Sequence, residues 1–496
     1  MNETAYDSVP YLGHVQSHTH PNRVAAIARL FGVNAPAVNT ARVLEVGCGD
    51  GGNLISIAYS LPQSHCVGFD LAATAVERAQ QRIAKLGLKN CEIVCADLAT
   101  VGKSLGEFDY VIAHGVYSWV PAELRESLLQ LISDSLSSRG VAFVSYNVYP
   151  GWHVAGMVRD MLRFHTREIA DPVERVKQSN ALMRFITAAH EADDPYGRLL
   201  AAECERLSGY PGWYLIHDDL ANVNDPLYFR DFVAHAKQFD LRYVAEADFA
   251  SMSSADLSED AREKLDELRG DPVLHGQYLD FVKCRRFRQS LLCHPTNDVA
   301  LQPINGSLRK LFVASTARPD SQPVDLSAGV EVQFRWTRSS LKTDHPLAKA
   351  VFVALAEHWP QCISLDALCN AIARLLGRPV QDEDAGLLEH IVVTAFGLRM
   401  VDVTSDEWRA ISTPGAYPKA SDLARMESEL GDIVTSLIHR RARVDDSTAR
   451  RLVQLSDGSR DRQTLVAELY RHDPLITNEV LQQRIKRLAL LGLYEA

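Results

Sequence analysis

RVLEVGCGDGGNL, residues 42–54, is the most informative stretch of this chain. It starts with a short β-rich run and continues through four glycines, at positions 47, 49, 51 and 52, into the helical pattern NLISIAYSL. A turn without side chains between a strand and a helix lets a ligand lie against the backbone at the helix N-terminus. The stretch therefore predicts a nucleoside-cofactor site at the first βα turn of an α/β fold.

Further β-rich runs follow this turn, with amphipathic helical segments between them. They are HCVGFD (65–70), CEIVCAD (91–97), FDYVIAHG (108–115) and VAFVSYNV (141–148). Buried runs separated by such helices are typical of βαβ units, so we expect a doubly wound, Rossmann-like parallel sheet with helices on both faces. The later runs LRYVAEADF (241–249) and FRQSLLC (287–293) are predicted to add two strands to the same sheet.

The chain of 496 residues is too long for one ordinary hydrophobic core. We expect a first domain over residues 1–295, with a helical insert at about 151–207. Residues 296–345 are interpreted as a connector that carries two strand-like runs. Two helix-rich modules are predicted after it, a winged-helix-like one at 346–404 and a C-terminal helical one at 405–496, which has a similar plan.

Composition narrows the class of protein. The formal net charge of −11 disfavours general attraction to nucleic-acid phosphates or anionic membranes. The start of the chain lacks the pattern of a signal peptide, and no run is apolar enough to span a membrane. The nine cysteines are scattered without CxxC pairs, which disfavours a structural metal site. We therefore expect a cytosolic protein with reduced thiols and no metal.

Acidic residues at three successive strand ends identify the cofactor class. The glycines fit both GxGxG and GxGxxG, so their spacing alone does not separate S-adenosylmethionine from a dinucleotide. Glu45 would repel a pyrophosphate but attract a cationic aminopropyl group and a sulfonium. Asp70 can accept hydrogen bonds from ribose hydroxyls, and Asp97 from the adenine amino group. Each acid alone is commonly a helix cap or a loop charge, but together they predict S-adenosylmethionine.

The chain also resembles a known family. The resemblance rests on YDSVPY (6–11), THPNR (19–23), LEVGCGDGGN (44–53), AHGVYSWVP (113–121), SYNVYPGW (145–152), NDPLYFRDF (224–232) and FRQSLLCH (287–294). These stretches resemble class I methyltransferases that carry a methyltransferase regulatory region, and among them rickettsial enzymes that methylate lysines of outer-membrane proteins. The resemblance implies S-adenosylmethionine as cofactor, protein lysines as the leading substrate, and a regulatory region at about 208–295.

Methyl transfer from a sulfonium chiefly needs a nucleophile held in line with the methyl group and shielded from water. If the nucleophile is a lysine, its ammonium must first lose a proton, which a desolvated aromatic pocket favours. The loops after the fourth and fifth strands supply aromatic side chains, although ordinary packing beneath the insert is the alternative for about half of them. The predicted catalytic set is Tyr117, Tyr146, Tyr149, Trp152, His217 and Asp218.

The segment before the first helix is expected to fold over the cofactor as a lid, with a disordered tail as the alternative. For the pair His217 and Asp218, a helix cap or surface turn is the alternative. The complete predicted cofactor set is Tyr6, Tyr11, His20, Glu45, Gly47, Gly49, Gly51, Asn53, Asp70, Leu71, Asp97, Leu98, His114 and Tyr117.

Two other functions remain open at this point. A small-molecule methyltransferase with an oxygen, nitrogen or carbon acceptor would share every cofactor residue. A DNA-binding regulator would use the basic runs HRRAR (439–443) and RIKR (484–487), but nearby acids dilute their charge, so nucleic acid is not the expected partner. The expected partner is a protein substrate or a small-molecule acceptor, and self-association would give a homodimer.

Overall fold

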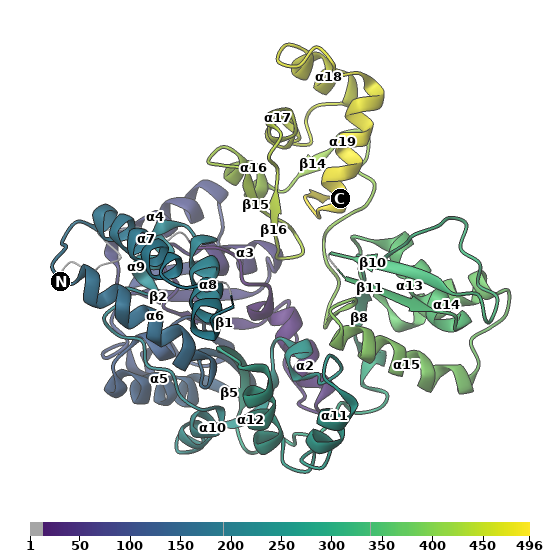
Figure 1. Ribbon diagram of the computed structural model, residues 1–496. Coiled ribbons are helices and arrows are strands. Elements are labelled where there is room, and N and C mark those ends of the chain that lie inside the picture. Colours follow the sequence, from purple (N-terminus) through teal and green to yellow (C-terminus); the bar gives the residue numbers. More distant parts are fainter. Residues whose placement is uncertain (1–12, 192, 338) are drawn as a thin grey trace.

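The computed structural model describes residues 13–191, 193–337 and 339–496, and a seven-stranded sheet lies in its first domain (Figure 1). The strand order is β3-β2-β1-β4-β5-β7-β6. Strands β1 to β5 are parallel, and β7 is antiparallel to both of its neighbours. The bounds are β1 Arg42–Val46, β2 His65–Asp70, β3 Cys91–Cys95, β4 Phe108–Ala113, β5 Leu136–Asn147, β6 Arg242–Glu246 and β7 Phe287–Cys293. The predicted α/β sheet is confirmed, including its last two strands.

Alternation along the strands gives this sheet two buried faces. Val43 and Phe143 belong to the core on one face, which includes helices α2 (Pro21–Leu30) and α3 (Gly52–Ser60). Leu44 and Val144 belong to the core on the other face, with α5 (Ala122–Ser135) and α10 (Phe229–Lys237). Burial on both faces explains why these strands read as continuous apolar runs in the sequence.

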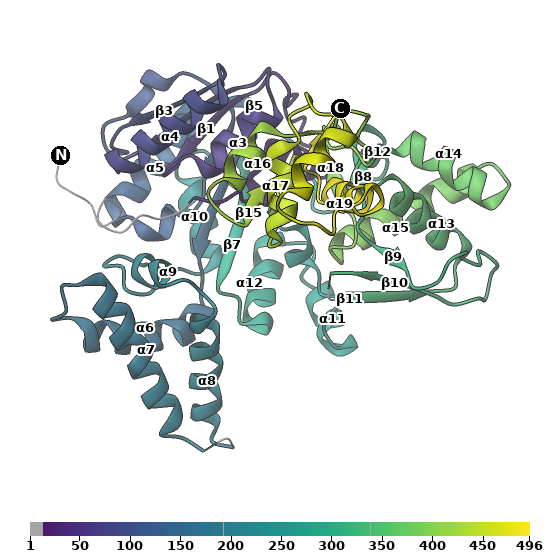
Figure 2. The same cartoon turned by 90° about the horizontal axis from the view of Figure 1, so that it is seen from above.

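The helical insert forms a bundle at one side of the sheet (Figure 2). It comprises α6 (Gly151–Thr166), α7 (Pro172–Ala188), α8 (Pro195–Ser208) and the short α9 (Gly212–His217). Asp171 and Asp194 cap the N-termini of α7 and α8, and a proline follows each cap. Apolar side chains of the bundle form their own core, which consists of Val158, Leu162, Met183, Leu200, Leu207, Leu215 and Leu220.

The segment that we interpreted as a connector supplies strands to the module that follows it. Strand β8 (Phe312–Ala314) pairs with β12 (Ile363–Ser364) and β13 (Asp402–Thr404), and a second small sheet joins β9, β10 and β11. The sequence showed strand-like runs here but not their partners, which lie about fifty to ninety residues further along the chain. The remaining bounds are β9 Arg318–Pro319, β10 Val332–Trp336, β11 Ser339–Thr343, α13 Pro346–His358, α14 Leu365–Leu376 and α15 Asp382–Gly397.

The C-terminal module combines four helices with two short two-stranded sheets. Its hairpin joins β15 (Ile433–Thr435) to β16 (Arg441–Arg443) and reaches helix α3 of the sheet domain (Figure 1). Across the described ranges, every helix is too short or too polar to cross a membrane. The other bounds are α16 Asp422–Ser428, α17 Ser447–Leu455, α18 Arg462–Tyr470, α19 Asn478–Leu490, β14 Lys419–Ala420 and β17 Tyr494–Glu495.

Candidate functional site

The glycine turn between β1 and α3 is held open by its backbone conformation and by Asp70. Gly47, Gly49 and Gly51 have φ angles of +67°, +54° and +73°, a region that side chains disfavour. The Gly49 N–H donates to Asp70 Oδ2 at 2.8 Å, and the Ala72 N–H donates to Asp70 Oδ1 at 2.9 Å. Asp70 therefore ties the end of β2 to the turn that follows β1.

Glu45 lies beneath this turn with one unsatisfied oxygen. Its Oε1 accepts a hydrogen bond from Asn53 Nδ2 at 2.8 Å, whereas Oε2 is buried without a hydrogen-bond partner among the described residues. Burial, with the nearby Asp70 carboxylate adding to it, raises the pKa of Glu45 to about 8. A donor or a cation on a ligand would satisfy this oxygen and favour the ionised form of Glu45.

These acids line one cavity of about 890 Å³ at the carboxyl ends of the parallel strands. Asp97 follows β3 and accepts the Ala99 N–H at 2.9 Å, while His114 follows β4. Burial lowers the pKa of His114 to about 4, so its ring is neutral at pH 7. The predicted cofactor residues that line the cavity are Glu45, Gly47, Gly49, Asn53, Asp70, Leu71, Asp97, Leu98 and His114.

The amino-terminal segment contributes residues other than the predicted ones. Tyr6 and Tyr11 lie outside the described residues. Gly13, His14 and Gln16 line the cavity, but no other residue of the segment does among those described. His20 is buried away from it, where Nδ1 accepts the Asn22 N–H and caps α2, and Nε2 contacts Ser60 Oγ at 2.8 Å. A histidine before Pro-Asn thus acts as a helix cap here, which the sequence pattern did not distinguish from a ligand contact.

The other end of the cavity carries aromatic rings, two carboxyl groups and the guanidinium of Arg206. Trp152 from α6 and Asp218 after α9, both predicted, line it together with Tyr210, Tyr214 and Asp219. The Tyr210 and Tyr214 rings are stacked with centroids 4.2 Å apart. The sequence did not predict Tyr210, Tyr214 and Asp219 as site residues, because the docking of this helical region onto the sheet has no local sequence signal.

The two carboxyl groups differ in their surroundings. Burial raises the pKa of Asp218 to about 7, and Asp219 adds to the rise, although the Tyr214 hydroxyl and Arg206 oppose it. Asp219 faces Arg206, with Oδ1 3.5 Å from the guanidinium Nη2. Asp218 therefore exchanges a proton near neutral pH at this end of the cavity.

Besides His20, five predicted site residues in the described part of the chain lie outside the cavity. Tyr146 stacks on Phe232 at 3.8 Å and bonds Ser290, while the Tyr117 hydroxyl contacts His235 Nδ1 at 2.7 Å, so both rings belong to the core beneath α10. Tyr149 does not line the cavity either, and its ring stacks on the His153 ring with centroids 4.0 Å apart. Gly51 and His217 are also absent from the described lining.

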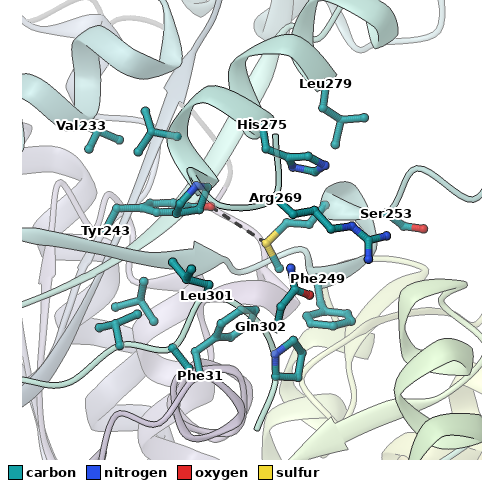
Figure 3. A pocket seen from close by; sticks show the side chains of 18 of the residues that line it. Phe31, Val233, Tyr243, Phe249, Ser253, Arg269, His275, Leu279, Leu301 and Gln302 are labelled. Carbon is teal, nitrogen blue, oxygen red and sulfur yellow. Dashed lines mark hydrogen bonds between the residues drawn. The ribbon is translucent and has the colours of Figure 1, made fainter. Parts of the chain in front are cut away.

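A second cavity, also of about 890 Å³, lies between the sheet edge at β6, helix α12 (Pro272–Lys283) and α15 (Figure 3). Its walls include the side chains of Phe31, Phe249 and Leu279, and those of His275 and Arg269 also line it. None of the predicted site residues lines it among those described. Size does not separate the two cavities, but only the first combines the glycine turn with the acids at the strand ends.

Three parts of the chain match known protein families. Residues 43–140 match the methyltransferase domain, residues 212–294 match the predicted methyltransferase regulatory domain, and residues 416–481 match the C-terminal winged helix domain of PKMT. The winged-helix match lies within the C-terminal module, which combines helices with short strands, whereas the winged-helix-like plan predicted for residues 346–404 stays a prediction.

Similar proteins occur in rickettsiae. The chain is 35% identical to the uncharacterised protein RP028 of Rickettsia prowazekii over 238 residues, which are 48% of this chain and 95% of RP028. It is 34% identical to RP789 of the same organism over 360 residues, covering 71% of this chain and 65% of RP789. PKMT2 from Rickettsia typhi in complex with AdoHcy aligns over 98% of this chain and 100% of its own, with 26% identity and a TM-score of 0.89.

Proposed function

We propose that this chain, which belongs to the family of the Rickettsia prowazekii protein RP028 and carries a methyltransferase domain, transfers methyl groups from S-adenosylmethionine to lysine side chains of a protein. One observation carries the proposal. A single cavity has the glycine turn with Glu45 and Asp70 at one end, and Trp152 with the acidic Asp218 at the other. A cationic cofactor and a cationic acceptor both fit such a cavity.

The residues of the first end fit the cofactor. A cationic amino group would satisfy the buried Glu45 Oε2. Asp70 ends β2 and Asp97 follows β3, where they would accept hydrogen bonds from the ribose and the adenine. When bound, S-adenosylmethionine would supply an electrophilic methyl group on its sulfonium.

The residues of the second end fit a lysine. Its ammonium meets the Asp218 carboxylate, and the indole of Trp152 and the ring of Tyr214 can cover its methylene stem and exclude water. Asp218 accepts one proton from the ammonium, which leaves a neutral amine with a free lone pair. With S-adenosylmethionine bound, that lone pair would form the new N–C bond as the S–C bond of the sulfonium breaks, which would give a methylated ammonium and S-adenosylhomocysteine.

Cofactor binding is expected to release a proton through Glu45. The pKa of the free Glu45 is about 8, and a bound cation lowers it, so below pH 8 binding must expel a proton. Affinity for S-adenosylhomocysteine should then fall as the pH decreases from 8 to 6, by up to about tenfold per pH unit. Calorimetry in buffers of different ionisation enthalpy measures the released proton. Glu45→Gln should remove the release, and an unchanged release in that variant would contradict this role.

Trp152 and Tyr149 form a matched pair for the acceptor end. Trp152→Ala is expected to lower kcat/KM for the protein substrate about tenfold, because the indole lines the cavity. Tyr149→Ala removes a ring that stacks on His153 outside the described lining, and should change kcat/KM by less than about twofold. Steady-state methylation assays compare the two. A larger loss in the Tyr149 variant would contradict the assignment.

Transfer of label tests the proposed function against the small-molecule alternative. The purified chain is incubated with methyl-labelled S-adenosylmethionine and a bacterial lysate, which is then separated into protein and small-molecule fractions. We expect the label in protein, and Asp70→Ala should strongly reduce it at a cofactor concentration that does not saturate the variant. Label confined to small molecules would replace the proposal with the alternative.

We further propose that the protein acts in the cytosol on an outer-membrane protein, and that it is a homodimer if it self-associates. The support is the family resemblance and the nine cysteines, all of which are free in the described chain. Separating the labelled proteins into membrane and soluble fractions tests the acceptor, and light scattering tests the assembly.

A further inference from the structure

The turn of the C-terminal hairpin places His439 inside the sheet domain. His439 is 2% exposed, and its Nε2 lies 2.9 Å from Asn53 Oδ1, across 386 residues of sequence. Its Nδ1 lies 2.9 Å from Ser56 Oγ on the same helix α3. The run HRRAR, which we considered as a DNA-binding feature, therefore begins with a residue buried against the cofactor helix.

Asn53 connects this histidine to the cofactor site. Its amide nitrogen donates to Glu45 Oε1 at 2.8 Å and to Thr19 Oγ1 at 2.9 Å. Its oxygen accepts the backbone N–H of Gln16 at 3.0 Å. A backbone N–H only donates, so this bond fixes the amide oxygen toward Gln16 and His439 and the nitrogen toward Glu45.

The orientation of Asn53 determines the tautomer of His439. Burial, with His20 and Arg23 nearby, lowers the pKa of His439 well below its usual range, although a hydrogen bond to the Gln16 backbone opposes the shift. The ring is therefore neutral and carries one N–H. Because the Asn53 oxygen is an acceptor, Nε2 must carry the hydrogen and donate it. Nδ1 then accepts the Ser56 hydroxyl hydrogen, and every hydrogen-bonding position of the ring is used.

An ion-pair cluster next to the histidine anchors the hairpin. Arg440 Nη2 lies 2.6 Å from Asp402 Oδ2, and Arg23 Nη1 from helix α2 lies 2.6 Å from Asp402 Oδ1. Burial alone would raise the pKa of Asp402, but the two guanidiniums lower it to about 2. The cluster joins the sheet domain, strand β13 and the C-terminal hairpin, and so fixes the position from which His439 reaches Asn53.

We infer that His439 is a positioning residue for the cofactor site: through Asn53 it orients the Glu45 carboxylate toward the cofactor's cationic end. The inference rests on the proposed function, because it assumes that S-adenosylmethionine occupies the cavity. It assigns the C-terminal winged-helix module a part in cofactor binding, so that displacement of the hairpin, for instance by a partner on this module, would lower cofactor affinity.

Two amide substitutions at His439 distinguish a role in positioning Asn53 from a role in packing. His439→Gln places a donor near the position of Nε2 and should keep the bond to Asn53, whereas His439→Asn reaches only the position of Nδ1 and keeps the bond to Ser56. His439 has a φ of +54°, which Asn tolerates better than Gln, so backbone strain alone would favour the Asn variant. Arg443→Ala is the control, because Arg443 lies on the same hairpin but pairs with Asp432 at the surface.

Calorimetry with S-adenosylhomocysteine, on full-length protein, is the readout. We expect the Asn variant to bind about five- to tenfold more weakly than the unaltered chain, as for one lost hydrogen bond, and the Gln and Arg443 variants to bind within about twofold of it. Thermal unfolding without ligand should rank Asn at least as stable as Gln. If the Asn and Gln variants bound S-adenosylhomocysteine equally well, the inference about His439 would be wrong while the proposed function would stand. Absence of binding by the unaltered chain would overturn the proposed function, and the inference with it.

Discussion

Asp70→Ala is expected to weaken the binding of S-adenosylhomocysteine about a hundredfold, the largest effect on affinity among the cofactor residues. The substitution removes two sets of hydrogen bonds that the carboxylate accepts. It would accept charge-assisted hydrogen bonds from the ribose, and it already accepts the N–H groups of Gly49 and Ala72, which shape the ligand side of the turn. Calorimetry on the purified variant measures the loss.

Asp97→Ala provides the comparison for this prediction. The Asp97 carboxylate accepts only the local Ala99 N–H among the described hydrogen bonds, so its loss removes the adenine contact without disturbing the glycine turn. We expect a weakening of about tenfold. Near wild-type affinity in the Asp70 variant, or tight binding of NAD by the unaltered chain, would contradict the assignment of this cavity.

Asp218→Asn is expected to lower kcat about a hundredfold with cofactor affinity nearly unchanged, because the amide does not accept the proton of the lysine ammonium. The pKa of Asp218 is raised to about 7, and only the ionised form accepts a proton. The rate should therefore rise with pH through about 7 in the unaltered chain, and this limb should be absent in the variant. Rate profiles from about pH 5.5 to 9 on a protein substrate measure both effects.

Asp219→Asn distinguishes this role from a general electrostatic one. Asp219 raises the pKa of Asp218, so removing its charge should shift the limb to lower pH without abolishing it. An Asp218 variant that kept both its rate and its limb near pH 7 would contradict the proposed proton transfer.

The sequence predicted those parts of the fold and site that depend on local order. Strand ends follow from buried runs, and the carboxyl ends of parallel strands meet at one edge, so the sequence alone places Glu45, Asp70 and Asp97 together, as the cavity lining does. The glycines predicted to form the turn have positive φ angles in the structure, because a residue without a side chain adopts such angles most easily.

Alternation along a strand explains why Tyr146, which was predicted to line the site, faces the core and not the cavity. In β5, Tyr146 faces the core and stacks on Phe232, whereas Asn147, one residue later, lines the cavity. A shift of one residue reverses which side chain faces the ligand, and composition alone does not resolve it. Trp152 lies on the helix that follows the strand and does reach the cavity.

The contacts between distant segments had no sequence signal. Tyr210, Tyr214 and Asp219 line the cavity because the insert docks on the sheet, and His439 reaches Asn53 across 386 residues. Such contacts depend on tertiary packing, which neither periodicity nor motif spacing encodes. The acceptor end was therefore the least predictable part of the site.

The most direct measurement is the chemical position of the transferred methyl group. Lysate protein labelled by the purified chain is digested, and the labelled peptides are sequenced by mass spectrometry, with the Asp218→Asn chain treated in parallel. Methylation on lysine ε-amines, strongly reduced in the variant, is the predicted result. Methylation confined to other side chains, or equal in the two samples, would contradict a cavity built for S-adenosylmethionine and lysine.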